Sequence, residues 1–236
     1  MAVKNRVTIA HLYPNEMNLY GDSGNVLCLY NRLVWRGYNV SVNEINIGDK
    51  FTGDFDILFI GGGQDREMEI IKNDLRKKSD ALKYFADSGK TILAICGGYQ
   101  ILGDYYETDK GTRIKLSSAL PFYTKSGKER MIGNCLYKTP FCTVAGFENH
   151  SGRTFLSKKL KPLGKVIKGC GNNGRDKTEG VLYNNTFGTY AHGPVLPKNP
   201  AFADELIKRA LNTEELAPLD DSTENTCHNQ LVSRFR

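Results

Sequence analysis

The stretch TILAICGGYQ, at residues 91–100, decides the fold. Its apolar residues 92–95 lead directly into Cys96, and two glycines separate this cysteine from residues that are compatible with a helix. We interpret the stretch as a buried strand that turns tightly at Cys96 into a helix. Such a turn lifts the sulfur out of the sheet edge and points a helix N-terminus at it, which favours thiolate over thiol. The stretch therefore predicts a nucleophilic cysteine.

A structural explanation of Cys96 carries similar weight when the stretch is considered alone. Buried cysteines often serve as small apolar packing residues, and Gly-Gly junctions between strand and helix are common in α/β proteins. The choice between the two explanations depends on which residues the rest of the chain brings to this cysteine.

The composition limits the class of protein. The chain has 236 residues, 40% of them hydrophobic, which is enough to bury a substantial core. It contains neither a run of about 18 apolar residues nor a signal-peptide core, so we expect an intracellular protein that does not span a membrane. The six cysteines lack zinc-binding spacing, and we expect them to stay reduced. The net charge of +6 is modest, and without a recognisable reader module we expect no nucleic-acid partner.

The first half of the chain alternates strand patterns with helix patterns. Apolar runs at residues 7–12 and 56–60 predict buried strands, and apolar spacings of three and four predict helices over residues 25–37 and 67–88. These patterns predict a mostly parallel central sheet flanked by helices. Right-handed crossovers then bring the loop that contains Gly62 to the same sheet edge as Cys96.

Three consecutive glycines, residues 61–63, follow the strand at residues 56–60. Glycine costs backbone entropy, so we expect this loop to use positive φ angles or bare N–H groups. A plain tight turn is the alternative.

The pattern changes after residue 102. Residues 105–178 are rich in Gly, Lys, Thr and Asn and contain short β-like stretches, which predicts an antiparallel β extension. No linker separates the two halves, so we expect a single domain over residues 1–211. A polar tail over residues 212–236 is expected to be loosely held.

Two of the four histidines are candidates for a partner of Cys96. His192 ends a strand-like segment and precedes Gly-Pro, where an imidazole can reach a thiol, so a catalytic role is favoured. His150 lies in a polar run and is interpreted as a structural or substrate-proximal residue. We expect His11 to be a packed core histidine and assign no role to His228.

Six stretches distributed over the chain carry a resemblance to a known family. They are LYPNEMNLYGDSGN (12–25), FIGGGQDRE (59–67), ILAICGGYQ (92–100), GFENHSGRTFL (146–156), GCGNN (169–173) and FGTYAHGPVLPKNP (187–200). Together they resemble the class I (triad) glutamine amidotransferases of the cobyric acid synthase type, and among these the amidotransferase subunits of lipid II isoglutaminyl synthases.

The resemblance implies a flavodoxin-like α/β fold and hydrolysis of L-glutamine to glutamate and ammonia. It implies that the ammonia passes to a Mur-ligase-like synthetase subunit, which uses ATP to amidate the D-glutamate of the lipid II stem peptide. The chain lacks a GxxxxGK nucleotide loop, so we expect no cofactor in it and expect ATP and Mg²⁺ on the partner. Lipid II would be reached through that partner, in the cytoplasm at the inner face of the membrane.

The resemblance also implies roles for individual residues. Cys96 matches the nucleophile, His192 the general base and later acid, and Arg130 the residue that holds the glutamine carboxylate. The chemistry agrees, because a carboxamide needs a thiolate, a proton for the leaving ammonia and donors for the oxyanion. The expected oxyanion donors are the N–H of Gly97 and that of Gly62 or Gly63. A guanidinium also suits a carboxylate better than a lysine would.

One position departs from the pattern of the family. Many triad amidotransferases carry a glutamate two residues after the histidine, where this chain has Pro194. The orienting acid must come from another residue of this chain, a water or the partner. We expect the partner to supply it, which would keep glutamine hydrolysis low until the complex forms.

Two other functions are compatible with these residues. The first is an amidotransferase that feeds another ATP-dependent ligase, such as a cobyric acid synthase-like enzyme. The second is a non-catalytic scaffold with the same fold, which the retention of Cys96, His192 and Arg130 weakens.

Overall fold

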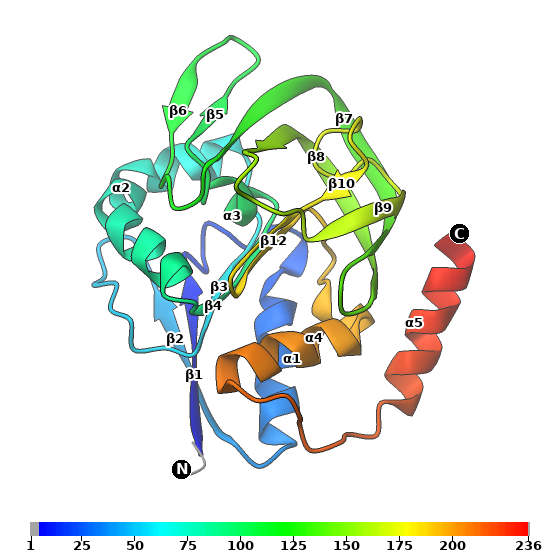
Figure 1. Cartoon of the computed structure of the whole chain (residues 1–236). Coiled ribbons are helices and arrows are strands. Elements are labelled where there is room, and N and C mark those ends of the chain that lie inside the picture. Colours follow the sequence, from blue (N-terminus) through cyan, green and yellow to red (C-terminus); the bar gives the residue numbers. More distant parts are fainter. Residues whose placement is uncertain (1–4, 236) are drawn as a thin grey trace.

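The central sheet is built from the apolar strands that the sequence predicts. The computed structural model describes residues 5–235, which form two sheets with helices packed against them (Figure 1). In the central sheet, each pair of neighbours is parallel except β11 and β12. In spatial order its strands are β11 (Val181–Tyr183), β12 (Thr186–Thr189), β4 (Thr91–Ile95), β3 (Ile57–Ile60), β1 (Arg6–Leu12) and β2 (Asn39–Ile45).

Helices cover both faces of this sheet, as buried parallel strands require. Figure 1 shows α2 on one side and α1 and α4 on the other. Every residue of β3, β4 and β12 is buried. The helices are η1 (Leu19–Gly21), α1 (Ser23–Val34), α2 (Asp65–Asp87), α3 (Gly97–Gln100), η2 (Leu196–Lys198), α4 (Pro200–Leu211) and α5 (Ser222–Phe235). The predicted parallel sheet flanked by helices is therefore confirmed.

The second sheet is the β extension that the composition of residues 105–178 predicts. Its long hairpin consists of β7 (Phe122–Lys138) and β8 (Thr143–Leu156), and the register of the hairpin is interrupted between Ser126 and Met131. The pairs are antiparallel except β5 with β7. The remaining strands are β5 (Tyr105–Glu107), β6 (Arg113–Lys115), β9 (Gly164–Lys168) and β10 (Thr178–Glu179).

The C-terminal segment is held more firmly than the sequence predicts. Helix α5 contacts β7 and β8, and Phe235 is buried against Leu136 and Ala145. The cause is that residues 231, 232 and 235 place apolar side chains on one face of a helix that otherwise looks polar. The expectation of a loose tail is therefore wrong, whereas the single domain over residues 1–211 stays a prediction.

An arginine joins this segment to the core. The buried Arg32 guanidinium on α1 donates to both carboxylate oxygens of Asp204 at 2.8 Å and to both of Asp221 at 2.7 Å. Because such bidentate pairs fix orientation, Arg32 sets the path of the chain between α4 and α5.

A buried carboxyl that joins the two sheets provides a test of how they pack together. Glu179 ends β10 and accepts hydrogen bonds from the Thr189 hydroxyl and the Tyr190 N–H, both at 2.7 Å. Burial raises the pKa of Glu179 from 4.5 to about 7. A carboxyl whose pKa rises on folding destabilises the native state progressively as the pH rises from its unfolded pKa to its folded pKa.

We predict that Glu179→Gln becomes more stable relative to wild type as the pH rises. The amide keeps an acceptor oxygen but removes the buried charge, so the difference in unfolding free energy should grow by about 2 kcal/mol between pH 5 and pH 8. Urea unfolding at both pH values measures it, with the exposed Glu214→Gln as the control. A pH-independent difference would contradict the prediction.

Candidate active site

Cys96 sits at the tight turn that the sequence predicts. It follows β4 and adopts φ 48° and ψ −105°, a conformation that non-glycine residues seldom adopt and that costs of order 1–3 kcal/mol. The two following glycines pack against the loop after β3, where a Cβ at Gly98 would lie 2.5 Å from the carbonyl oxygen of Ile60. Cys96 is therefore held in a strained conformation by surrounding backbone.

The helix that follows Cys96 is shorter than expected. It comprises only the four residues of α3, so its dipole contributes little to the sulfur. The expectation that a helix N-terminus activates Cys96 must therefore be corrected in favour of a charged neighbour.

The loop at residues 61–63 requires glycines because neighbouring atoms approach its backbone closely. None of the three glycines has a positive φ in the left-handed region, so of the two expected uses the structure shows the bare N–H, which Gly62 donates to Asp22. A Cβ at Gly61 would clash with the carbonyl oxygen of Met17. A Cβ at Gly62 would lie 2.8 Å from Cε1 of His192 and 2.9 Å from Oδ2 of Asp22. The loop thus lets three chain segments meet without side chains between them.

His192 reaches the same edge of the sheet from the neighbouring strand. Strand β12 pairs in parallel with β4, so the segments that follow both strands emerge side by side. The His192 N–H donates to the carbonyl of Phe147 at 2.7 Å, which ties this segment to β8. The His192 side chain is completely buried.

Asp22 is the acidic neighbour of His192. Its Oδ2 lies 3.4 Å from His192 Nδ1, and both side chains are fully buried. The distance is that of an ion pair, although Nδ1 has no hydrogen bond of good geometry. The same Oδ2 accepts a hydrogen bond from the Gly62 N–H at 2.8 Å. Asp22 thus links the N-terminus of α1, the glycine loop and the imidazole.

The electrostatics of this group favour a protonated imidazole. Burial by itself would lower the pKa of His192, but the Cys96 charge and the Asp22 carboxylate outweigh burial and raise the pKa to about 10. At neutral pH the site therefore holds an imidazolium beside Cys96 and Asp22. A positive charge at this position favours the nucleophilic form of a neighbouring cysteine.

Arg130 lies in the interrupted part of the β7–β8 hairpin and reaches the same pocket as Cys96. Its Nε donates to Oδ1 of Asn149 at 2.9 Å, and Nη2 donates to the carbonyl of Asn149 at 3.1 Å. The cavity is about 30 Å³, the space of roughly one water molecule. Among its lining residues are Cys96, Arg130, Gly63, Gln100, Asn149 and His150.

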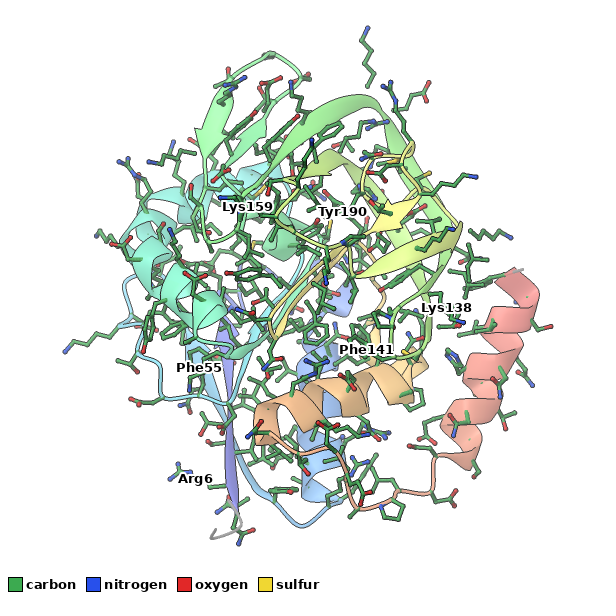
Figure 2. All side chains as sticks on the ribbon, viewed as in Figure 1. Arg6, Phe55, Lys138, Phe141, Lys159 and Tyr190 are labelled. Atoms are coloured by element: carbon green, nitrogen blue, oxygen red, sulfur yellow. The ribbon has the colours of Figure 1, made fainter. Side chains whose placement is uncertain are left out.

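The other histidines have structural environments. His150 stacks on Tyr190 with ring centroids 3.6 Å apart, and its Nδ1 pairs with the carbonyl of Gly152 at 2.8 Å. Tyr190, labelled in Figure 2, lies buried between the two sheets. Burial lowers the pKa of His150, and it lowers the pKa of His11 to about 4. The expectation that His11 is a core histidine is confirmed.

Sequence reasoning anticipated the convergence of Cys96 and His192 but did not identify Asp22. Asp22 lies 74 residues before Cys96 in a turn-rich stretch, and its only signal was membership of the matching stretch at residues 12–25. Within residues 5–235, no three His, Cys, Asp or Glu side chains are arranged to hold a metal ion. In the same range, every helix is too short or too polar to cross a membrane.

Comparison with known proteins identifies the relatives of this chain. Residues 8–200 match the CobB/CobQ-like glutamine amidotransferase domain. The chain is 44% identical to the lipid II isoglutaminyl synthase (glutamine-hydrolyzing) subunit GatD of Streptococcus pneumoniae, over 87% of this chain and 81% of that protein. It is 41% identical to the subunit of the same name from Staphylococcus aureus, over 97% of this chain and 96% of that protein.

More distant relatives and solved structures agree on the fold. Cobyrinate a,c-diamide synthase of Archaeoglobus fulgidus is 29% identical over 81% of this chain, although the match spans only 41% of that protein. A glutamine amidotransferase from Thermotoga maritima superposes with a TM-score of 0.55 at 14% identity, covering 97% of both chains. The PurLQS structure from the same organism gives 0.54 at 20% identity, covering 89% of this chain and 98% of that chain. The expected class I amidotransferase fold is confirmed.

We predict that His192→Asn slows alkylation of Cys96 by iodoacetamide several-fold at pH 7. The pKa of His192 is raised to about 10, so the wild-type protein holds a positive charge beside the sulfur, and a neighbouring positive charge makes a cysteine more reactive. The variant keeps a polar side chain but removes this charge. Peptide mass spectrometry measures the rate, with the exposed Cys227 as the internal reference. Equal rates in the two proteins would refute the role of the imidazolium.

Proposed function

The chain belongs to the CobB/CobQ-like glutamine amidotransferase family, and on this premise we propose that it is the glutamine-hydrolysing subunit of a lipid II isoglutaminyl synthase. It supplies ammonia to a Mur-ligase-like synthetase, which amidates the D-glutamate of the lipid II stem peptide. The observation that carries the proposal is 41% identity over 97% of this chain and 96% of a GatD subunit. The match therefore includes the segments that carry Asp22, Cys96, Arg130 and His192.

The family assignment also bears on the two alternative functions. A glutamine amidotransferase is an enzyme, so the non-catalytic scaffold is not supported. A role in cobyric acid synthesis is less favoured because the chain spans only about two-fifths of such relatives. No observation favours either alternative over the lipid II enzyme.

The first half of the reaction forms a thioester. Arg130 holds the α-carboxylate of glutamine, which directs the side-chain amide toward Cys96. The thiolate attacks the amide carbon, and the electron pair of the C=O bond moves to oxygen. As the tetrahedral intermediate collapses, the C–N bond breaks and the His192 imidazolium gives its proton to the leaving ammonia.

The oxyanion contacts two backbone N–H groups in this scheme. The Gly62 N–H is engaged by the Asp22 carboxylate, so we correct the expectation that it serves as a donor. Gly63 lies against Gly97, since a Cβ at Gly97 would be 2.6 Å from the Gly63 nitrogen. We therefore assign the donors to Gly63 and Gly97. Loss of one such donor costs about 3 kcal/mol in a serine protease.

The second half of the reaction releases glutamate. Neutral His192 takes a proton from water, the hydroxyl attacks the thioester carbon, and the C–S bond breaks to restore the thiolate. These steps use only protein groups and water. ATP and Mg²⁺ belong to the synthetase in this scheme, and the complex works in the cytoplasm at the inner face of the membrane.

Asp22 takes the place of the orienting acid in this proposal. Of the sources open at the sequence level, a residue of this chain is favoured over the partner, because a buried carboxylate already lies 3.4 Å from His192 Nδ1. It holds the ring in orientation and stabilises the imidazolium.

The function is tested with the reconstituted complex of this chain and its synthetase. We predict that Cys96→Ser abolishes amidation of lipid II when glutamine is the nitrogen source but leaves it intact with ammonium chloride, because only ammonia production is lost. Mass spectrometry of the stem peptide measures amidation, and Cys227→Ser is the matched control. If the Cys96→Ser complex still uses glutamine, or if the wild-type complex leaves lipid II unmodified with either nitrogen source, the proposal is wrong.

The role of Asp22 predicts a separate outcome. Asp22→Asn keeps an acceptor oxygen for the Gly62 N–H but removes the charge beside the imidazole. We expect kcat for glutamine hydrolysis to fall by about tenfold or more, which corresponds to at least about 1.4 kcal/mol, with a smaller change in KM. The pKa of His192 should fall in the variant, which an NMR titration of the imidazole measures. Unchanged kcat and unchanged titration would return the role to the partner subunit.

A further inference from the structure

Tyr20 lies over the buried imidazole of His192. The two rings meet edge to face, with centroids 5.1 Å apart and planes at 80°. Tyr20 has φ 59° and ψ 25°, a left-handed conformation that is strained for a bulky residue. The preceding residue is anchored to the glycine loop, because the Leu19 N–H donates to the carbonyl of Gly62 at 3.0 Å. A strained turn therefore holds an aromatic ring over His192, next to Leu19, which lines the cavity.

The hydroxyl of Tyr20 connects this ring to Arg130. Nδ2 of Asn149 donates to the Tyr20 hydroxyl at 2.5 Å. Oδ1 and the carbonyl of the same asparagine accept from Nε and Nη2 of Arg130. Asn149 is thus shared between a ring that covers His192 and the guanidinium that the proposed function assigns to the substrate carboxylate.

Asn149 occupies one of the two edges of Arg130 that a carboxylate can use. Nε and Nη2 together form this parallel-donor edge, through which arginine binds carboxylates bidentately. Asn149 offers this edge only neutral acceptors, whereas a carboxylate adds the attraction of its own negative charge. Glutamine can therefore displace Asn149 from this edge, which leaves Asn149 without the contacts that orient it toward Tyr20.

The narrow cavity beside Cys96 agrees with such a displacement. A space of about 30 Å³ holds roughly one water molecule, whereas glutamine is several times larger. Leu19, which precedes Tyr20, and Asn149 both line this space. Rotation of the Asn149 side chain and movement of the turn at Leu19 and Tyr20 enlarge the site without disturbing β4 or β12, the strands that Cys96 and His192 follow.

We propose that Tyr20 is a positioning residue that couples recognition of the α-carboxylate at Arg130 to access to Cys96 and His192. In the free protein Asn149 holds Tyr20 over the imidazole. When the carboxylate takes the edge of Arg130, the bond between Asn149 and Tyr20 is released and the mouth opens. This inference rests on the proposed role of Arg130 in binding glutamine.

The decisive variant is Tyr20→Phe, which keeps the ring but removes the hydroxyl. The lost hydrogen bond exists only in the free protein, so KM for glutamine should fall about fivefold, the equivalent of one neutral hydrogen bond, while kcat changes less than about twofold. A purely structural role would leave KM unchanged or raise it. Tyr84→Phe on the outer face of α2 is the matched control.

A second measurement does not depend on glutamine. Without substrate, alkylation of Cys96 by iodoacetamide should be about fivefold faster in Tyr20→Phe than in wild type, because the open state is more populated. Tyr20→Gly fits the left-handed conformation without strain and removes the ring, so it should accelerate alkylation further and lower kcat as water reaches His192. The exposed Cys227 again serves as the reference.

The outcomes separate this inference from the proposed function. If neither variant alters alkylation of Cys96 and KM is unchanged, the coupling is overturned, while glutamine-dependent amidation of lipid II still stands. If the complex does not amidate lipid II but both variants accelerate alkylation, the gate at Tyr20 stands and the identity of the acceptor is wrong.

Discussion

The site depends on a close approach of backbone that only glycine permits. The loop at residues 61–63 lies against Met17 on one side, against Asp22 and His192 on another, and against the turn after Cys96 on a third. A single methyl group at any of these glycines meets a backbone oxygen, a carboxylate, a sulfur or an imidazole. Because these neighbours are themselves buried, the loop fixes the distances between Cys96, His192 and Asp22.

The buried charges of Asp22 and His192 contribute little net free energy to the stability of the fold. At 3.4 Å and an effective dielectric of 20, the attraction between Asp22 and the imidazolium is about 5 kcal/mol. Desolvation of two fully buried ions costs several kcal/mol each, which roughly cancels the attraction. What remains is the protonation state, because the Cys96 charge and the Asp22 carboxylate outweigh burial and raise the pKa of His192 to about 10. In the proposed reaction this proton goes to the leaving ammonia.

The sequence predicted the parts of the molecule that depend on local pattern. Apolar runs predicted β1, β3 and β4, and the apolar-to-glycine transition predicted the tight turn at Cys96, though not its strained backbone. The sequence could not predict that Asp22 lies beside His192. In the sequence, a carboxylate in a turn cannot be distinguished from any other polar turn residue, and only the fold brings it to His192. The sequence likewise did not predict the packing of α5. This helix has low hydrophobicity, and its few apolar residues pack on β7 and β8. The sequence also did not predict how short α3 is. Ile101 and Leu102 continue its helical pattern, but they lie in a turn.

The location of the acid changes how low activity in the isolated chain would be explained. The sequence led us to expect that the partner supplies the orienting acid, because Pro194 stands where many triad amidotransferases have a glutamate. If Asp22 orients His192 as proposed, the catalytic group needs no outside carboxylate. Any restraint on hydrolysis must then lie in access to the group. The narrow cavity and the ring of Tyr20 provide such a restraint, and Tyr20 is 44% exposed, so a docking protein can contact it directly. A partner that moves Tyr20 would raise glutamine hydrolysis by opening the site, with no contribution of its own to the chemistry.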